Sequence, residues 1–203
     1  MIKMKVLLTL LGFILSLHIN AQCAGQQSFT LNPQPTNGTY SPGTVVTVCY
    51  TMSGWNGTGF GSNWLEGFSI DLGSAWTNLT PLNPPANCNG GNGQWLWVQS
   101  TISSSTGIAA GPGFFFETSQ GGPINGNPGD DWGDFGTNCN WSFCFQVTVT
   151  QQCNPQSLLI QVTAGADGTW GSWINNSCPL VPFTIFNGTT NATPVTTSQI
   201  SHN

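Results

Sequence analysis

Residues 143–150 read FCFQVTVT, a stretch in which large apolar side chains alternate with smaller or polar ones. Phe143, Phe145, Val147 and Val149 would share one face of an extended chain, because successive side chains of a strand point to opposite faces. This period of two is typical of a half-buried β-strand and differs from the 3.6-residue period of an amphipathic helix. We therefore predict a strand here, with one face in a core.

Two further segments show the same alternation, and four others follow it in part. The clearer two are residues 45–52 and 158–162, and the weaker candidates are residues 68–72, 94–99, 114–118 and 182–186. Turn-forming stretches rich in Gly, Asn and Pro separate them. Short alternating strands without a helical period predict an all-β chain, a single β-sandwich with long Gly/Asn-rich loops and disulfides. A closed barrel is the alternative.

The N-terminus has the pattern of a secretory signal peptide. Lys3 and Lys5 precede an apolar run over residues 6–17, and the small Ala21 offers a cleavage point. The apolar run is shorter than the roughly 20 residues that a membrane-spanning helix needs, so we expect no transmembrane segment. The expected organisation is a signal peptide over residues 1–21, a β-sandwich domain over residues 22–186 and a disordered Thr/Asn/Ser-rich tail over residues 187–203.

Cleavage after Ala21 would leave a mature chain without lysine or arginine. The whole sequence contains two Lys or Arg residues, Lys3 and Lys5, against seven carboxylates. Binding a phosphate backbone requires cationic side chains that neutralise phosphates and release counterions. Nucleic acids and anionic lipid headgroups are therefore poor partners. Neutral glycans and other cell-surface proteins remain as candidate partners.

Seven cysteines in an exported chain indicate disulfides. Cys49 and Cys144 lie on the more polar faces of two clear strands, so they are candidates for one bridge. Cys153 and Cys178 flank a strand with its following turn and are candidates for a second. One cysteine remains over, and we expect it to be Cys23, as a free, intermolecularly paired or lipidated residue. A zinc site is disfavoured because no histidine lies near the closely spaced cysteines.

Most catalytic machinery is excluded by composition. A histidine-dependent triad is not expected, because the histidine left in the mature chain, His202, lies in the C-terminal tail. Glycoside hydrolysis by paired carboxylates remains as the alternative function, with Glu66, Asp71 and Glu117 as candidates. Glu66 and Asp71 would point to opposite faces of one continuous strand unless a bulge or turn intervened. We therefore expect no catalytic residues.

Nine tryptophans are the second chemical feature of the chain. Trp95 and Trp97 share one face of the strand expected over residues 94–99 and could form a flat platform for a pyranose ring. Trp55 and Trp132 lie among Gly, Asn and Asp, which are surroundings typical of exposed loops. These four are the candidate carbohydrate-binding residues. The alternative is that they pack in the core, where aromatic rings contribute most burial.

Residues 125–134 read NGNPGDDWGD and place three Asp residues within a Gly/Asn-rich loop. Ca²⁺ takes six to eight oxygen ligands from flexible loops. We therefore name Asn127, Asp130, Asp131 and Asp134 as candidate calcium ligands, although the segment lacks the spacing of an EF-hand. The alternative is a solvated acidic turn.

Three motifs resemble segments of uncharacterised secreted β-rich proteins of the Bacteroidetes. They are residues 63–67 (NWLEG), 141–145 (WSFCF) and 167–173 (DGTWGSW), and residues 20–22 resemble the exit of their export signals. The resemblance spans roughly residues 40–180 and implies a secreted or cell-surface setting without a settled activity. Residues and resemblance together predict a non-catalytic β-sandwich module for adhesion, surface structure or carbohydrate binding.

The mature protein should resist trypsin even when it is reduced and denatured, because removal of residues 1–21 takes away both lysines. Mass spectrometry of secreted material after tryptic digestion tests this. Tryptic fragments derived from residues beyond Ala21 would contradict the prediction.

Overall fold

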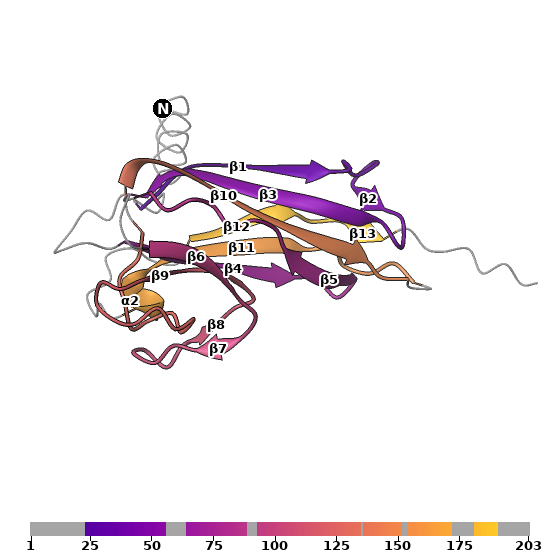
Figure 1. Cartoon of the computed structure of the whole chain (residues 1–203). Helices are drawn as coiled ribbons and strands as arrows, with labels where there is room; N and C mark the ends of the chain where they lie inside the picture. The colour runs from indigo at the N-terminus through magenta and orange to yellow at the C-terminus, as the bar shows by residue number, and fades with distance from the viewer. Residues whose placement is uncertain are drawn as a thin grey trace, which may run out of the picture.

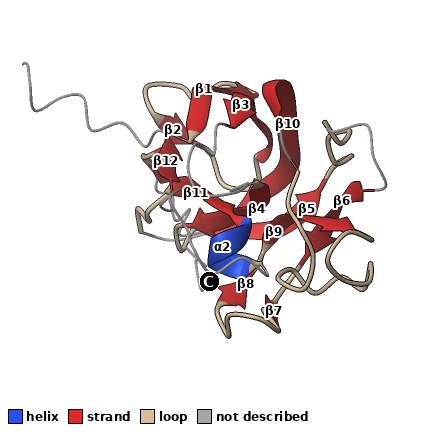
Figure 2. Ribbon diagram, turned by 90° about the vertical axis from the view of Figure 1, so that its left-hand side faces the viewer, coloured by secondary structure: helices blue, strands red, loops and turns tan. Residues whose placement is uncertain are grey.

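A computed structural model describes residues 23–55, 64–88, 93–134, 136–151, 154–171 and 181–190. The predicted signal peptide lies outside these ranges. The chain forms two antiparallel sheets packed face to face, with the orders β1-β3-β10-β5 and β12-β11-β4-β9-β6 (Figures 1 and 2). This arrangement confirms the predicted all-β sandwich.

The four-stranded sheet contains β1 (Ala24–Asn32), β3 (Val45–Trp55), β10 (Gly136–Val149) and β5 (Trp76–Pro81). The five-stranded sheet contains β12 (Val181–Phe186), β11 (Ile160–Ala166), β4 (Leu65–Leu72), β9 (Gly113–Thr118) and β6 (Gly93–Val98). Short pairs are made by β2 (Thr39–Tyr40) with β13 (Thr189–Thr190) and by β7 (Thr101–Ile102) with β8 (Ala109–Ala110). The single described helix, α2 (Asp167–Trp170), directly follows β11.

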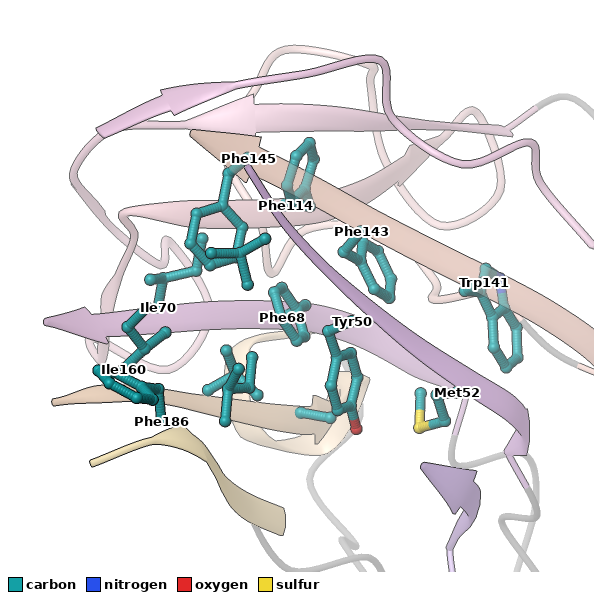
Figure 3. Close-up of a cluster of buried hydrophobic side chains, with 14 of the residues drawn as sticks. Tyr50, Met52, Phe68, Ile70, Phe114, Trp141, Phe143, Phe145, Ile160 and Phe186 are labelled. Carbon is teal, nitrogen blue, oxygen red and sulfur yellow. The ribbon is translucent and has the colours of Figure 1, made fainter. Parts of the chain in front are cut away.

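The alternating segments of the sequence became the strands that enclose the core. Tyr50 of β3 and Phe143 of β10 are directly opposite each other, and both rings stack on Phe68 of β4 in the other sheet. The centroids of Phe68 and Phe143 are 4.6 Å apart and their planes differ by 5°. Figure 3 shows this aromatic column between the two sheets. Stacked aromatic pairs add to the free energy gained by burial.

Two disulfides are described, and one of them was predicted. Cys49 and Cys144 lie directly opposite each other on β3 and β10, with Cα atoms 4.1 Å apart. The second bridge joins Cys88 to Cys139. Cys23 is buried and disulfide-bonded, so the expectation that it is the leftover cysteine was wrong. The predicted pair Cys153 and Cys178 lies outside the described residues.

Two parts of the domain departed from expectation. β1 and β5 were not predicted as strands, because both are sheet edges whose mostly polar residues lack a clear alternation. The ordered chain also extends past the predicted domain end at residue 186. Thr190 of β13 is buried, and its hydroxyl accepts a hydrogen bond from the backbone N–H of Gln156 at 3.0 Å. Residues 191–203 of the predicted tail lie outside the described ranges.

Replacing the central bridge by Cys49→Ala/Cys144→Ala should lower the free energy of unfolding by about 2–5 kcal/mol, because a loop spanning 95 residues is released in the unfolded chain. Equilibrium urea denaturation measures the change. Thr51→Ala/Ser142→Ala is the matched control, since these residues form the next pair on the same face of the same strands. Equal effects of the two double variants would contradict the prediction.

Candidate functional site

Four buried carboxylates gather at one end of the five-stranded sheet, and we call them the carboxylate cluster. Glu66 lies at the start of β4, and Glu117 lies at the end of the antiparallel neighbour β9. Asp131 belongs to the loop over residues 119–134, which connects β9 to β10. Asp167 is the first residue of α2, which packs against β4 and β11. The site is therefore assembled from four separate parts of the chain.

The cluster lies on the face of the sheet that points away from the central core. Phe114 and Phe116 of β9 belong to that core, so the intervening Phe115 and the following Glu117 project to the opposite face. Phe115 contacts Trp170 of α2 edge-on, with ring centroids 5.2 Å apart. The helix thus covers this part of the outer face. Glu117 is buried beside the helix, although its side chain lies outside the central core.

A β-bulge places Glu66 in the cluster. Leu65 pairs with Ala166 and Gly67 pairs with Gly165, which leaves Glu66 as an extra residue on β4. A bulge redirects the side chain of the extra residue and interrupts the regular alternation of a strand. Glu66 thereby comes within electrostatic range of the other three carboxylates. Asp71, its predicted alternative partner, remains exposed toward the far end of the strand.

The cluster is closed to solvent, and several of its oxygens accept no hydrogen bond. Glu66, Glu117 and Asp131 are 0% exposed, and Asp167 is 2% exposed. Oε2 of Glu117 accepts the backbone N–H groups of Asn125 at 3.0 Å and Gly126 at 2.9 Å. Both oxygens of Glu66, Oε1 of Glu117 and Oδ1 of Asp167 have no partner. Buried polar atoms without a partner are rare and destabilising.

Burial raises the pKa of every carboxyl group in the cluster. The pKa of Glu66 lies well above its ordinary value because of burial and the negative charges of Asp131, Asp167 and Glu117. The nearby backbone N–H of Gly129 lowers the pKa of Glu66 and so partly offsets this rise, although it is not placed to form a regular hydrogen bond with either carboxylate oxygen. Burial raises the pKa of Asp131 to about 8 and that of Asp167 to about 7. In the absence of a bound cation, the cluster therefore retains protons near neutral pH.

The structure divides the predicted calcium ligands. Asp131 belongs to the cluster, and Asp130 lies near enough for its charge to raise the pKa of Glu117 and Asp131. Oδ1 of Asn127 and Oδ1 of Asp130 are buried without a partner. Within the described ranges, no three His, Cys, Asp or Glu side chains form a complete metal-binding group. The sequence did not indicate Glu66, Glu117 or Asp167 as neighbours of this loop, because a bulge and a tertiary contact bring them there.

Asp134, the fourth predicted ligand, has a structural role away from the cluster, and its role as a calcium ligand stays a prediction. Its Oδ2 accepts the indole N–H of Trp141 at 2.7 Å, the indole N–H of Trp95 at 3.2 Å and the backbone N–H of Cys88 at 2.8 Å. Its own backbone pairs with Leu65 at the start of β4. These charge-assisted bonds satisfy two buried indoles and connect the 119–134 loop to both sheets.

The predicted sugar platform is largely buried. Trp95 is 2% exposed and contacts the core ring of Phe143, with centroids 4.9 Å apart. Trp97 is half-buried, and Trp55 is buried. The prediction was wrong for Trp95, because the face of β6 that carries it is the core face, and for Trp55, because the last residue of β3 is also buried in the core. Trp132 is exposed, as predicted, and contacts Trp64 edge-on at 5.0 Å.

Comparisons with known proteins show no family for this chain. No protein-family model matches it, and no curated protein matches it. Among solved structures, it is similar to a cohesin module from a family 33 glycoside hydrolase of Clostridium perfringens. That similarity has 12% identity and a TM-score of 0.33 over 85% of this chain and 100% of the other, and it is too weak to support an argument. No helix in the described part of the chain is long and apolar enough to cross a membrane.

In EDTA, the protein should become less stable as the pH rises. The folded pKa values of Asp131 and Asp167 lie near 8 and 7, above the value of about 4 for an unfolded carboxyl group. The folded state therefore binds more protons, so the stabilisation is complete below about pH 4 and is lost as the pH rises through the folded values. We expect the melting temperature at pH 8.5 to be about 5 °C or more below that at pH 5.

Thermal unfolding followed by circular dichroism at the two pH values measures this difference. Glu66→Gln should reduce it, because the substitution removes one titrating group from the cluster. A metal-free wild type that melts at the same or a higher temperature at pH 8.5 would show that the cluster does not hold these protons.

Proposed function

We propose that the protein is a secreted or cell-surface, non-catalytic β-sandwich module that acts in adhesion or surface structure. The burial of the acids that glycoside hydrolysis would require supports this proposal most directly. Glu66 and Glu117 have no exposed surface, while Asp71 is exposed and belongs to no carboxylate pair in the cluster. A catalytic acid or base must come within hydrogen-bonding reach of its substrate. Two carboxylates closed to solvent do not meet that requirement.

An extracellular setting is supported by the disulfides. The bridges Cys49–Cys144 and Cys88–Cys139 are typical of an oxidising compartment, because cytosolic thiols are normally kept reduced. The described residues contain no Lys, Arg or His, so an anionic partner would find no side-chain cation on them. The proposed partner is therefore another protein whose contact surface is not anionic.

The exposed apolar side chains concentrate beside the carboxylate cluster. Of the six large apolar side chains exposed in the described ranges, four lie on the β7–β8 hairpin or the 119–134 loop, namely Ile102, Ile108, Ile124 and Trp132. The hairpin and the loop meet where Ser103 lies against Gly129. Figure 1 shows the hairpin beyond α2, outside the two main layers. Exposed apolar residues that gather in one region are typical of binding surfaces.

Carbohydrate binding is the second candidate function, and Trp132 favours it. Trp132 is 37% exposed, and its ring packs against that of Trp64 in a T-shaped arrangement. An exposed indole held by a second aromatic ring could stack on one neutral sugar. The buried Trp95 and Trp55 have no such surface.

The first experiment tests for catalysis. Release of reducing ends from a panel of polysaccharides should be absent for the wild type and equally absent for Glu66→Gln/Glu117→Gln, because neither acid reaches solvent. Turnover by the wild type that the double variant loses would establish a glycoside hydrolase and overturn the proposal.

The second experiment tests the apolar surface. Beads coated with the mature protein are tested for adhesion to cells of the producing organism and for binding to a glycan array. Ile124→Ser/Trp132→Ala should weaken cell adhesion about tenfold or more, as expected for apolar anchors of an interface. Val45→Ser is the matched control, because Val45 is equally apolar and exposed but pairs with the far end of β10. Equal adhesion of all three proteins would contradict the proposed surface, and array binding lost only on Trp132→Ala would assign carbohydrate binding.

A further inference from the structure

We propose that the carboxylate cluster of Glu66, Glu117, Asp131 and Asp167 binds one calcium ion, which joins the 119–134 loop to β4, β9 and α2. This site differs from the one expected from sequence, since it omits Asp134 and includes three acids from outside the loop. It does not depend on the proposed adhesive function.

Burial without a partner is the first argument. Glu66 is 0% exposed, and neither of its oxygens accepts a hydrogen bond. It lies within electrostatic range of Glu117, Asp131 and Asp167, so its surroundings are negatively charged. An ionised carboxylate in a protein interior is strongly destabilising, so such a group either takes up a proton, pairs with a cation or coordinates a metal. Glu66 is therefore either protonated or bound to a cation that no described side chain provides.

The composition of the chain determines what kind of ligand this is. The described ranges contain no Lys, Arg or His, so no described side chain can neutralise the cluster. The N–H groups of Asn125 and Gly126 satisfy only Oε2 of Glu117. Protons neutralise the cluster while no ion is bound, and a small cation is the species that can replace them, because it interacts favourably with several carboxylates at once in a site closed to solvent.

The available donor atoms favour Ca²⁺ over other cations. All of them are oxygens, and the buried unpartnered set extends to Oδ1 of Asn127 and Oδ1 of Asp130 at the border of the cluster. Ca²⁺ accepts six to eight oxygens in variable geometry, whereas Mg²⁺ demands a near-octahedral shell and usually keeps several waters. Zinc would prefer nitrogen and sulfur ligands, which the cluster lacks. Oxygen number and burial together therefore fit calcium.

Binding would require the cluster to contract. The described acids do not already form a complete metal-binding group, so the ion must draw them closer together. Asp131 is the member that can approach, because it belongs to a loop, whereas Glu66 and Glu117 belong to paired strands. Calcium would therefore order the loop against the sheet and stabilise the folded state by mass action.

Isothermal titration calorimetry of the EDTA-treated, dialysed mature protein tests the site directly. We expect one equivalent of Ca²⁺ to bind, and Mg²⁺ to bind more weakly. The melting temperature should rise by about 5 °C or more when free Ca²⁺ exceeds its Kd a hundredfold. A wild type that shows no binding heat and melts identically in EDTA and in Ca²⁺ would overturn the proposal.

Substitutions then locate the ion. Glu66→Gln and Asp167→Asn each remove one charge from the cluster and should weaken Ca²⁺ binding about tenfold or more. Asp71→Asn is the matched control, because it removes one exposed carboxylate from the same strand as Glu66. It should leave the affinity unchanged within about twofold. Equal losses in Asp71→Asn and Glu66→Gln would show that calcium binds through net charge and would overturn the proposed site.

A spectroscopic measurement keeps the proposal testable if the variants fold poorly. Tb³⁺ replaces Ca²⁺ in oxygen sites and luminesces when a nearby indole transfers excitation to it. Trp170 lies against Gly67 and Gly129, the neighbours of the cluster, so excitation of tryptophan should give Tb³⁺ emission. Added Ca²⁺ should abolish that emission, whereas Mg²⁺ at the same concentration should not. Absence of sensitised emission from the wild type would contradict a site beside α2.

Discussion

The burial of carboxyl groups among described residues that include no Lys, Arg or His to pair with them is the constraint on which this structure depends. Five of the seven carboxylates are buried, namely Glu66, Glu117, Asp131, Asp134 and Asp167. Asp134 is stabilised by two indoles and a backbone amide, and Glu117 by two loop amides. The bulge at Glu66 and the short helix α2 then bring the remaining acids to the same end of the sheet. Backbone donors, tryptophans and a proposed ion thus replace the salt bridges of an ordinary protein.

The fold was predictable where one side of a strand faces the core and the other does not. Residues 143–150 and 45–52 alternate because β10 and β3 are central strands with one apolar face, and their predicted bridge follows from direct pairing. β1 and β5 could not be found in this way, since an edge strand with many exposed residues needs no regular alternation. The pairing of β13 with β2 was equally hidden, because it depends on hydrogen bonds between Thr-containing segments far apart in sequence.

The kind of ligand atom at the site could be predicted from the sequence, but the set of residues that form the site could not. An acidic Gly/Asn-rich loop indicated oxygen ligands, and Asp131 does enter the cluster. The structural role of Asp134 could not be predicted from the residues around it in sequence, because its hydrogen-bond partners Trp95 and Trp141 belong to two separate strands. The position of Glu66 could not be predicted either. An alternating sequence pattern assumes a regular strand, and the bulge at Glu66 interrupts the strand. Trp95 was misassigned for the complementary reason: alternation revealed its face but not which face was the core.

The position of the central bridge has a mechanical consequence for the proposed adhesive role. Cys49 and Cys144 are separated by 95 residues. While their bond is intact, tension applied at residues 23 and 190 cannot extend the segment between the two cysteines. At about 3.5 Å per residue, roughly 330 Å of contour length is withheld from stretching. A loaded molecule would therefore lengthen by a short, fixed amount and then transmit force through a covalent link. Reduction of that bond alone would release about 150 Å of this length, since the inner bridge Cys88–Cys139 would still withhold 51 residues.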